Sequence, residues 1–343
     1  METSVITTPE TAIAVQPADA VDLHLHTLAS DGAWTPAALV DQLVAEGIRV
    51  AAVCDHDTQR SVLETMRRAE RRGIHIIPGV EITTNWRDRQ WHLLVYGIRP
   101  DRADEAAAPF RAVLAELDAR LAWLGEDARQ RFERSGRKLA SLEEIVGGRP
   151  LWPYHVLRAA IREGHAANLK TAAELTRQLG GDFNADLPLA RVVEAAHQAG
   201  GLCVVAHPGR GDTVGVMTEA DLEAMLAAGI AIDGLEGHYR SYTDQQTAEY
   251  REMAVRHGLL ISCGSDSHAA KQPVDPKPWR AIWCADLLRR LGLEVAPLPD
   301  GEPVWEAGMP LATKPEPPPD AGSEAGVATN GAEPAATERH TYY

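Results

Sequence analysis

Short apolar runs and longer amphipathic stretches alternate along most of the chain. Each apolar run has the length of a buried strand, and most are followed by a polar loop and a stretch with helical spacing of Ala, Leu and Arg. This alternation predicts parallel strands joined by crossover helices. The predicted strands are Val21–Leu25, Arg49–Cys54, His75–Pro78, Trp91–Tyr96, Leu202–Ala206, Ile232–Leu235 and Leu259–Cys263. The predicted helices are Pro36–Glu46 (with Thr35 as N-cap), Ser61–Arg72, Leu189–Ala199, Glu219–Ala228 and Thr243–His257.

Three segments depart from this pattern. Between residues 101 and 186 the strand signal disappears, and the sequence predicts a helical insertion that caps the mouth of the sheet domain. Residues 1–20 and 314–343 have few large apolar side chains and are rich in Pro, Ala, Gly, Thr and Glu, so we expect both to be disordered. The segments 21–100 and 187–300 remain for one α/β domain.

Composition narrows the class of protein. The net charge of −15 argues against a stable DNA complex or a broad nonspecific grip on nucleic acid, although a nucleotide or short RNA fits if bound cations reverse the local field. There is neither a run of 18 apolar residues nor a secretory signal pattern, so we expect no membrane partner and a cytoplasmic location. The four cysteines lack a CxxC pair and are predicted to be reduced core residues.

Metal-ligand side chains occur at the ends of the apolar runs. Strand ends of a parallel α/β barrel converge on one face, so these separate segments are predicted to form one pocket, whereas chance would scatter such residues over helices and loops. Open sites of imidazole and carboxylate suit Mn²⁺, Fe²⁺ or Zn²⁺. Nine such ligands predict a site for two to three divalent ions: His24, His26, Asp31, His56, Glu81, His92, His207, Asp266 and His268.

The motifs around these residues resemble those of a known family. HLH, SDG, DHDT, PGVEIT, AHPGR and GSDSH, in this order, are similar to the polymerase and histidinol phosphatase (PHP) superfamily, and their spacing resembles a bacterial branch of nucleotide phosphatases and 5′-end exoribonucleases. The resemblance covers Val21–Leu293 and implies a distorted (β/α)7 barrel with three metal ions. It assigns His24, His26, Glu81 and Asp266 to the first ion, Glu81, His92 and His207 to the second, and Asp31, His56 and His268 to the third.

Further residues are candidates for catalysis or substrate binding. Asp57 is expected to orient a ligand imidazole or to accept the proton of the nucleophile, the alternative being that it only caps the helix that begins near Ser61. Arg210 is expected to bind a phosphate oxygen, the alternative being a solvated loop arginine. His155 resembles a histidine of the same family branch, and His238 follows a strand that leads to the predicted pocket; Arg158 and Tyr239 are weaker candidates.

These residues predict a phosphoesterase that uses a metal-bound hydroxide, with a phosphomonoester of a nucleotide or small metabolite as substrate. Three alternatives remain open. The first is the same centre acting on short RNA as a 5′-3′ exoribonuclease, or on cyclic phosphates. The second is an amidohydrolase, which often bridges two metals through a carboxylated lysine at a strand end, although the five lysines here lie away from strand ends. The third is a non-catalytic module, although no ligand of the pattern is missing.

Overall fold

The computed structural model describes residues 13–211, 215–271 and 274–313. The described chain divides into two compact units, one of residues 13–117 and 186–313 and the other of residues 118–185. The predicted tail, 314–343, and the first twelve residues of the predicted disordered N-terminus lie outside the described residues.

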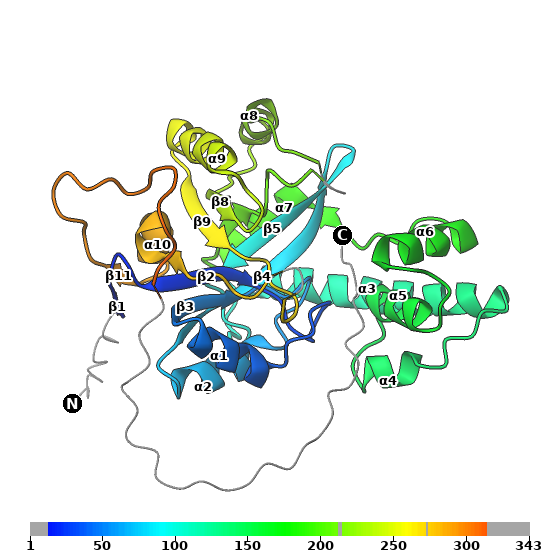
Figure 1. Ribbon diagram of the computed structural model, residues 1–343. Coiled ribbons are helices and arrows are strands. Elements are labelled where there is room, and N and C mark those ends of the chain that lie inside the picture. The colour runs from blue at the N-terminus through cyan, green and yellow to red at the C-terminus, as the bar shows by residue number, and fades with distance from the viewer. Residues whose placement is uncertain (1–12, 212–214, 272–273, 314–343) are drawn as a thin grey trace, which may run out of the picture. The chain divides into compact units, whose positions relative to one another are not determined.

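The first unit is built on a curved sheet of nine strands (Figure 1). Eight of them follow the order β10-β2-β3-β4-β5-β7-β8-β9, and β6 pairs with β4. The strands are β2 (Ala20–Leu25), β3 (Ile48–Val53), β4 (His75–Trp86), β5 (Arg89–Tyr96), β6 (Leu187–Pro188), β7 (Leu202–Val205), β8 (Gly234–Tyr239), β9 (Leu260–Gly264) and β10 (Trp279–Arg280). An isolated parallel bridge between Leu25 and Ser267 brings the end of β2 next to the end of β9, so the sheet is a nearly closed barrel.

One strand runs against the others. β5 is antiparallel to both β4 and β7, whereas β2, β3, β4 and β7, β8, β9 pair in parallel. A two-residue turn joins β4 to β5, so no crossover helix is needed there. The predicted α/β class and distorted (β/α)7 barrel are confirmed, and the antiparallel β5 is the distortion.

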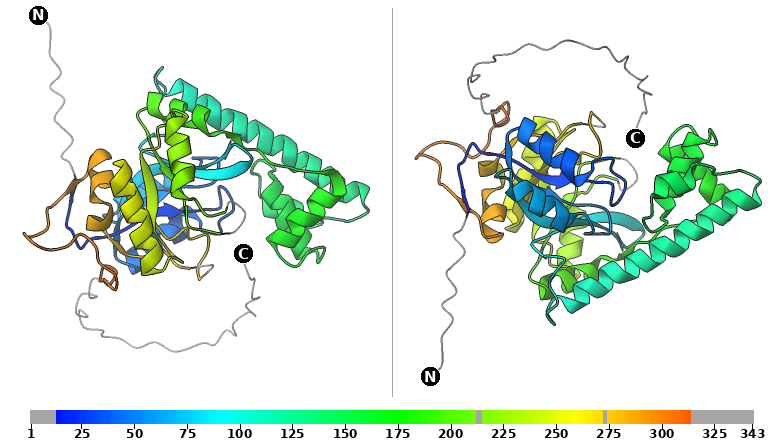
Figure 2. Two further views of the ribbon diagram at one scale, coloured as in Figure 1. Left: turned by 90° about the horizontal axis from the view of Figure 1, so that it is seen from above. Right: turned by 90° about the horizontal axis from the view of Figure 1, so that it is seen from below.

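Helices cover the outside of this sheet (Figure 2). They are α1 (Pro36–Ala45), α2 (Val62–Glu70), α7 (Leu189–Gln198), α8 (Glu219–Ala227), α9 (Asp244–His257), η1 (Ala281–Cys284) and α10 (Ala285–Arg290). Thr35 caps α1 by accepting a hydrogen bond from the Ala38 amide, as predicted. Both faces of the strands are buried: Leu93 and Val95 of β5 belong to one core cluster, and Leu94 and Tyr96 belong to another.

The N-terminal strand departs from the prediction of disorder. Within the predicted segment 1–20, β1 (Ala14–Val15) pairs in parallel with β11 (Glu294–Val295). The reason is local, because Val15 is buried in the same core cluster as Val295 and two residues suffice for that contact.

The second unit is helical, and its described residues, 118–185, are fewer than the predicted insertion 101–186. It contains the C-terminal part of α3 (Ala108–Arg134), which crosses the unit boundary, together with α4 (Leu142–Val146), α5 (Pro153–Arg162) and α6 (Leu169–Gly180). Its own core includes Phe132, Val156 and Ala160. The capping role of this insertion stays a prediction.

Two expectations from composition can be checked directly. All four cysteines are buried and free, as predicted. Among the described residues, no helix has the length and apolar character needed to cross a membrane.

Candidate metal centre

The nine predicted ligands lie together in the first unit, on strands β2, β4 and β5 and in the loops after β2, β3, β7 and β9. They form overlapping groups whose ligand atoms lie within 4.8 Å of one another. The groups are His24, His26, Glu81 and Asp266; His26, Asp31, His56 and His268; and His56, Glu81 and His92. His207 joins them because its Nε2 lies 3.0 Å from Glu81 Oε1.

The antiparallel direction of β5 explains the position of His92. Its side chain stands near the start of β5 and not at the end of a strand, yet in the β4–β5 ladder it pairs with Thr83, two residues beyond Glu81. The start of β5 therefore lies at the same edge of the barrel as the ends of the parallel strands. His56 reaches that edge through an isolated bridge to Glu81.

Glu81 is the centre of the arrangement. Its Oε1 lies 2.9 Å from His92 Nδ1 and 3.0 Å from His207 Nε2. Its Oε2 lies 3.0 Å from His24 Nε2 and 3.1 Å from His26 Nε2. The two oxygens thus face two different sets of imidazoles, which is the geometry that a bridging carboxylate needs.

The Asp31 side is more open. Asp31 Oδ2 lies 3.1 Å from His268 Nε2 and 3.8 Å from His56 Nε2, while Oδ1 lies 3.5 Å from His26 Nδ1. The side chains of Asp31, His56 and His268 are each a little over one-fifth exposed. A ligand approaching from solvent meets this group before the buried His24 and Glu81.

The ionisation of these groups fits a cation site. Burial opposes the charged form of Glu81, but His56, His24 and His92 hold its pKa well below the usual range. Burial also opposes protonation of His26, yet hydrogen bonds to Asp266 and Glu81 and the charges of Asp31 and Glu81 raise its pKa to about 10. The carboxylates therefore stabilise positive charge inside the cluster, and a metal ion bound there would displace the protons.

Unsatisfied imidazole nitrogens support the same conclusion. His26 Nδ1 and His56 Nδ1 are buried and have no hydrogen-bond partner in the described chain. A buried polar atom without a partner costs free energy, and a bound ion would remove that cost. The donor set and the orphaned nitrogens thus both fit divalent transition metals.

Backbone strain concentrates at the same place. Five non-glycine residues in the described chain have positive φ, and Asp57 (56°), His207 (30°) and Asp266 (53°) all belong to this region. Such conformations cost about 1–3 kcal/mol each and persist where the surrounding structure enforces them, often at functional sites. Gly264 is also required here, because a Cβ on it would overlap His24 Cβ and Glu236 Oε1.

Three buried carboxylates that the sequence analysis missed hold the ligands in place. Glu236 Oε1 lies 3.0 Å from His24 Nδ1, and its Oε2 accepts from the His207 amide at 2.6 Å. Asp55 accepts from the amide and hydroxyl of Thr27 and from the Ser30 hydroxyl, which fixes the loop before Asp31. The third, Asp22, accepts from the amides of Ser265 and Lys277.

Glu236 also settles which nitrogen of His24 faces the cluster. When Nδ1–H donates to the carboxylate, the lone pair of Nε2 is directed at Glu81 and His26, as in other metal-binding histidines that are oriented by a carboxylate. These carboxylates had a sequence signal, since each interrupts an apolar run: VDLHL, VCDHD and LEGHY.

Asp57 and Arg210 lie at the edge of the centre. Asp57 accepts from the Thr83 amide at 2.8 Å and from the Thr83 hydroxyl at 3.0 Å, and burial raises its pKa to about 6 against the lowering effects of His56 and Thr83. Arg210 is partly exposed, and its Nη1 lies 3.3 Å from Asp266 Oδ2. The structure therefore brings both residues close to predicted ligands.

His238 is not brought into the centre. It stacks on Trp283 with ring centroids 4.8 Å apart, and Arg251 Nη1 lies 2.9 Å from its Nε2. The cause is a bulge: from Glu236 to His238 the strand β8 advances two residues while β9 advances one, so the usual alternation of faces is broken. Burial and the Arg251 charge lower the pKa of His238 well below its ordinary value.

His155 belongs to the second unit. Its Nδ1 accepts a hydrogen bond from the Trp152 amide at 3.1 Å, at the start of α5. The side chain therefore caps a helix, and a contact with substrate stays a prediction.

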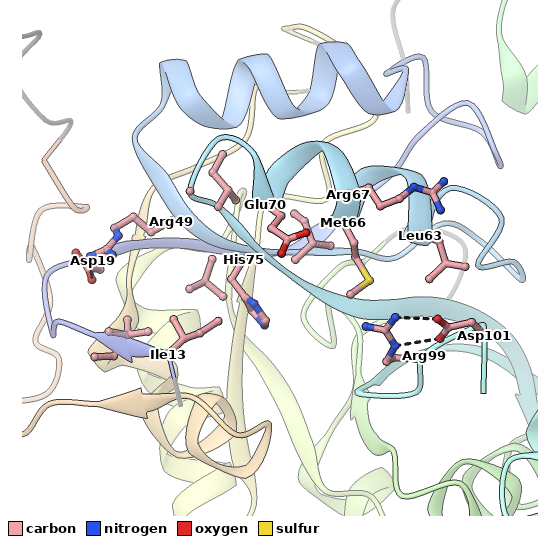
Figure 3. Close-up of a pocket in the computed structure, with 16 residues that line it drawn as sticks. Ile13, Asp19, Arg49, Leu63, Met66, Arg67, Glu70, His75, Arg99 and Asp101 are labelled. Atoms are coloured by element: carbon pink, nitrogen blue, oxygen red, sulfur yellow. Dashed lines mark hydrogen bonds and ion pairs between the residues drawn. The ribbon is translucent and has the colours of Figure 1, made fainter. Parts of the chain in front are cut away.

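A large hollow lies elsewhere on the first unit (Figure 3). It has a volume of about 710 Å³ and is lined by residues at the starts of β3 and β4, among them Arg49 and His75. None of the predicted ligands lines the hollow, and His56 and Glu81 lie further along the chain from the starts of β3 and β4. This hollow is therefore separate from the candidate metal centre, which is identified by the chemistry of its side chains.

The chain is similar to several known proteins. A family model described as a PHP domain matches residues 22–122. A 5′-3′ exoribonuclease of Haemophilus influenzae is 31% identical over 257 residues, which cover 72% of this chain and 89% of that protein. A 3′,5′-nucleoside bisphosphate phosphatase of Chromobacterium violaceum is 31% identical over 265 residues, covering 73% of this chain and 87% of that protein. A solved structure of an amidohydrolase from C. violaceum, with bound sulfate and no metal, is 26% identical, has a TM-score of 0.65 and covers 79% of this chain and 96% of that one.

Proposed function

The chain belongs to the PHP-domain family and is a hydrolase of phosphate ester bonds, and from this premise we propose that it removes a phosphate monoester from a nucleotide or small phosphorylated metabolite. The observation that carries the proposal is the position of Glu81, whose two oxygens face separate groups of histidines. The bisphosphate phosphatase among the relatives supports a nucleotide substrate.

The proposed ligand sets follow from the contacts. His24, His26, Glu81 and Asp266 would hold one ion; Glu81, His92 and His207 a second; and Asp31, His56 and His268 a third. Bound divalent ions would lower the pKa of water and neutralise the phosphoryl oxygens, so no nucleophilic side chain is required.

Side chains of the protein would orient the metal ligands, transfer a proton and bind the phosphate. Glu236 fixes the tautomer of His24, and Asp55 fixes the loop that carries Asp31. We propose that Asp57 accepts or relays a proton next to His56, and that Arg210 binds a phosphoryl oxygen at the edge of the centre.

We expect the purified protein to carry two to three equivalents of Mn, Fe or Zn, because nine ligands exceed the coordination number of one ion. Elemental analysis by mass spectrometry, on protein prepared without chelators, measures this directly. A protein that holds one equivalent or none, and takes up no more on titration with Mn²⁺ or Zn²⁺, would contradict the proposed ligand sets.

The substrate is tested with the Mn²⁺-loaded protein and a panel of phosphate esters. The panel contains nucleoside monophosphates, nucleoside 3′,5′-bisphosphates, sugar phosphates, cyclic phosphates and short 5′-phosphorylated RNA, with released phosphate and shortened RNA as readouts. We expect the highest kcat/KM on a nucleotide monoester. A preference for stepwise shortening of RNA would instead favour the activity of the H. influenzae relative.

A further inference from the structure

Asp266 uses its two carboxylate oxygens for different purposes. Its Oδ1 faces the imidazoles, 3.1 Å from His26 Nε2 and 3.4 Å from His268 Nδ1. Its Oδ2 faces away from them, toward Tyr239, Arg240 and Arg210. The side chain is almost fully buried, so neither oxygen is left to bulk water.

Arg240 makes the tightest contacts with the Asp266 loop. Its Nη1 lies 2.5 Å from Asp266 Oδ2 and 2.9 Å from each of the carbonyl oxygens of Ser265 and Asp266. The Arg240 side chain is 13% exposed, and its guanidinium lies over the Tyr239 ring at 4.7 Å from the centroid. It is therefore held against the loop and is not a mobile surface cation.

The loop needs such support because its backbone is strained. Asp266 has a φ of 53°, which is unusual for a residue other than glycine. Its amide donates to His24 O at 2.8 Å, and the His26 amide donates to Ser267 O at 3.0 Å, so β2 ties the loop on one side. On its other side the loop is held by Arg240, which contacts the carbonyl oxygens of Ser265 and Asp266 and the Oδ2 atom of Asp266.

We infer that Arg240 is a positioning residue for Asp266. By occupying Oδ2 together with Tyr239, it leaves Oδ1 as the oxygen available to a metal and fixes the direction in which that oxygen points. Asp266 is then a monodentate ligand whose position depends on a side chain that touches neither metal nor substrate. This inference rests on the proposed metal centre, because it assigns a role to a residue behind one of its ligands.

The neighbouring Arg210 provides a matched comparison. It approaches the same oxygen, but at 3.3 Å, and its side chain is 29% exposed. Its Nη1 also lies 3.5 Å from the Tyr239 hydroxyl, so both of these contacts are longer than those that Arg240 makes with the Asp266 loop. The two arginines are therefore expected to act differently: Arg240 on metal affinity and Arg210 on substrate.

The test is a calorimetric titration of metal-free protein with Mn²⁺, comparing wild type with Arg240→Ala, Arg240→Gln and Arg210→Ala. We expect Arg240→Ala to weaken the binding of at least one ion by roughly ten- to a hundredfold, the usual effect of removing a residue that orients a metal ligand. Arg240→Gln keeps a shorter, uncharged donor and should lose less. Arg210→Ala should bind Mn²⁺ as wild type does.

A second readout separates positioning from general loss of structure. Activity of Arg240→Ala should recover as the Mn²⁺ concentration is raised, while circular dichroism shows a wild-type fold in both Arg240 variants. If wild type binds no Mn²⁺, the proposed metal centre fails. If wild type binds Mn²⁺ and folded Arg240→Ala binds it equally well, the centre stands and the role of Arg240 is wrong.

Discussion

Replacing Glu81 by glutamine is expected to lower kcat by roughly a thousandfold, about 4 kcal/mol of transition-state stabilisation, and to release bound metal. The carboxylate contacts His92 and His207 through one oxygen and His24 and His26 through the other. An amide has no negative charge and presents a donor where one of these oxygens stands, so it cannot bridge two cations.

The matched control is Glu70→Gln, which makes the same chemical change at an exposed position beside the separate hollow. It should keep wild-type metal content and turnover. The Glu81→Gln measurement is steady-state kinetics with elemental analysis on protein of confirmed fold. Near-normal turnover with full metal content would show that Glu81 is not the bridge.

The barrel could be predicted from sequence because its strands are buried on both faces. Continuous apolar runs such as Leu202–Ala206 differ clearly from the amphipathic helices around them, and each of the seven predicted strands and five predicted helices has a counterpart in the structure. Two strand ends were misplaced. β4 continues from Pro78 to Trp86 because it forms a hairpin with β5, and β8 extends to Tyr239 through the polar residues Glu236 and His238.

Most of the candidate ligands could be found because they directly follow apolar runs, whereas the contacts of the residues behind them could not be predicted. Glu236 acts on His24, which is 212 residues away in the chain, and no local pattern predicts such a partner. The position of His238 could not be predicted from the sequence either, because one bulge in β8 turns its side chain away from the metal centre. Arg240 follows β8 directly, and its contact with Asp266, 26 residues further along the chain, is visible only in the folded structure.

The partly exposed Arg210 is the residue at which metal binding and substrate binding can be separated. A guanidinium has no lone pair to give a cation and is repelled by one, so its partner in a loaded centre must be an anion. In this structure that partner is Asp266 Oδ2, at a distance of 3.3 Å, which is longer than a strong charge-assisted hydrogen bond. A phosphoryl oxygen of the substrate is a better partner and can be reached from a side chain that is still partly exposed.

Arg210→Ala is therefore expected to leave metal content unchanged and to lower kcat/KM by roughly ten- to a thousandfold, the loss of a charge-assisted contact worth about 1.5–4 kcal/mol. Arg210→Lys should recover only part of the activity, because a point charge cannot make a bidentate contact. The control is Arg289→Ala, which removes a partly exposed arginine that pairs with Asp286 on α10. Kinetics on the best substrate of the panel, together with elemental analysis, measure both effects. If kcat/KM of Arg210→Ala equals that of Arg289→Ala, Arg210 is a solvated loop residue, and the phosphate is bound by the metal ions or by other side chains.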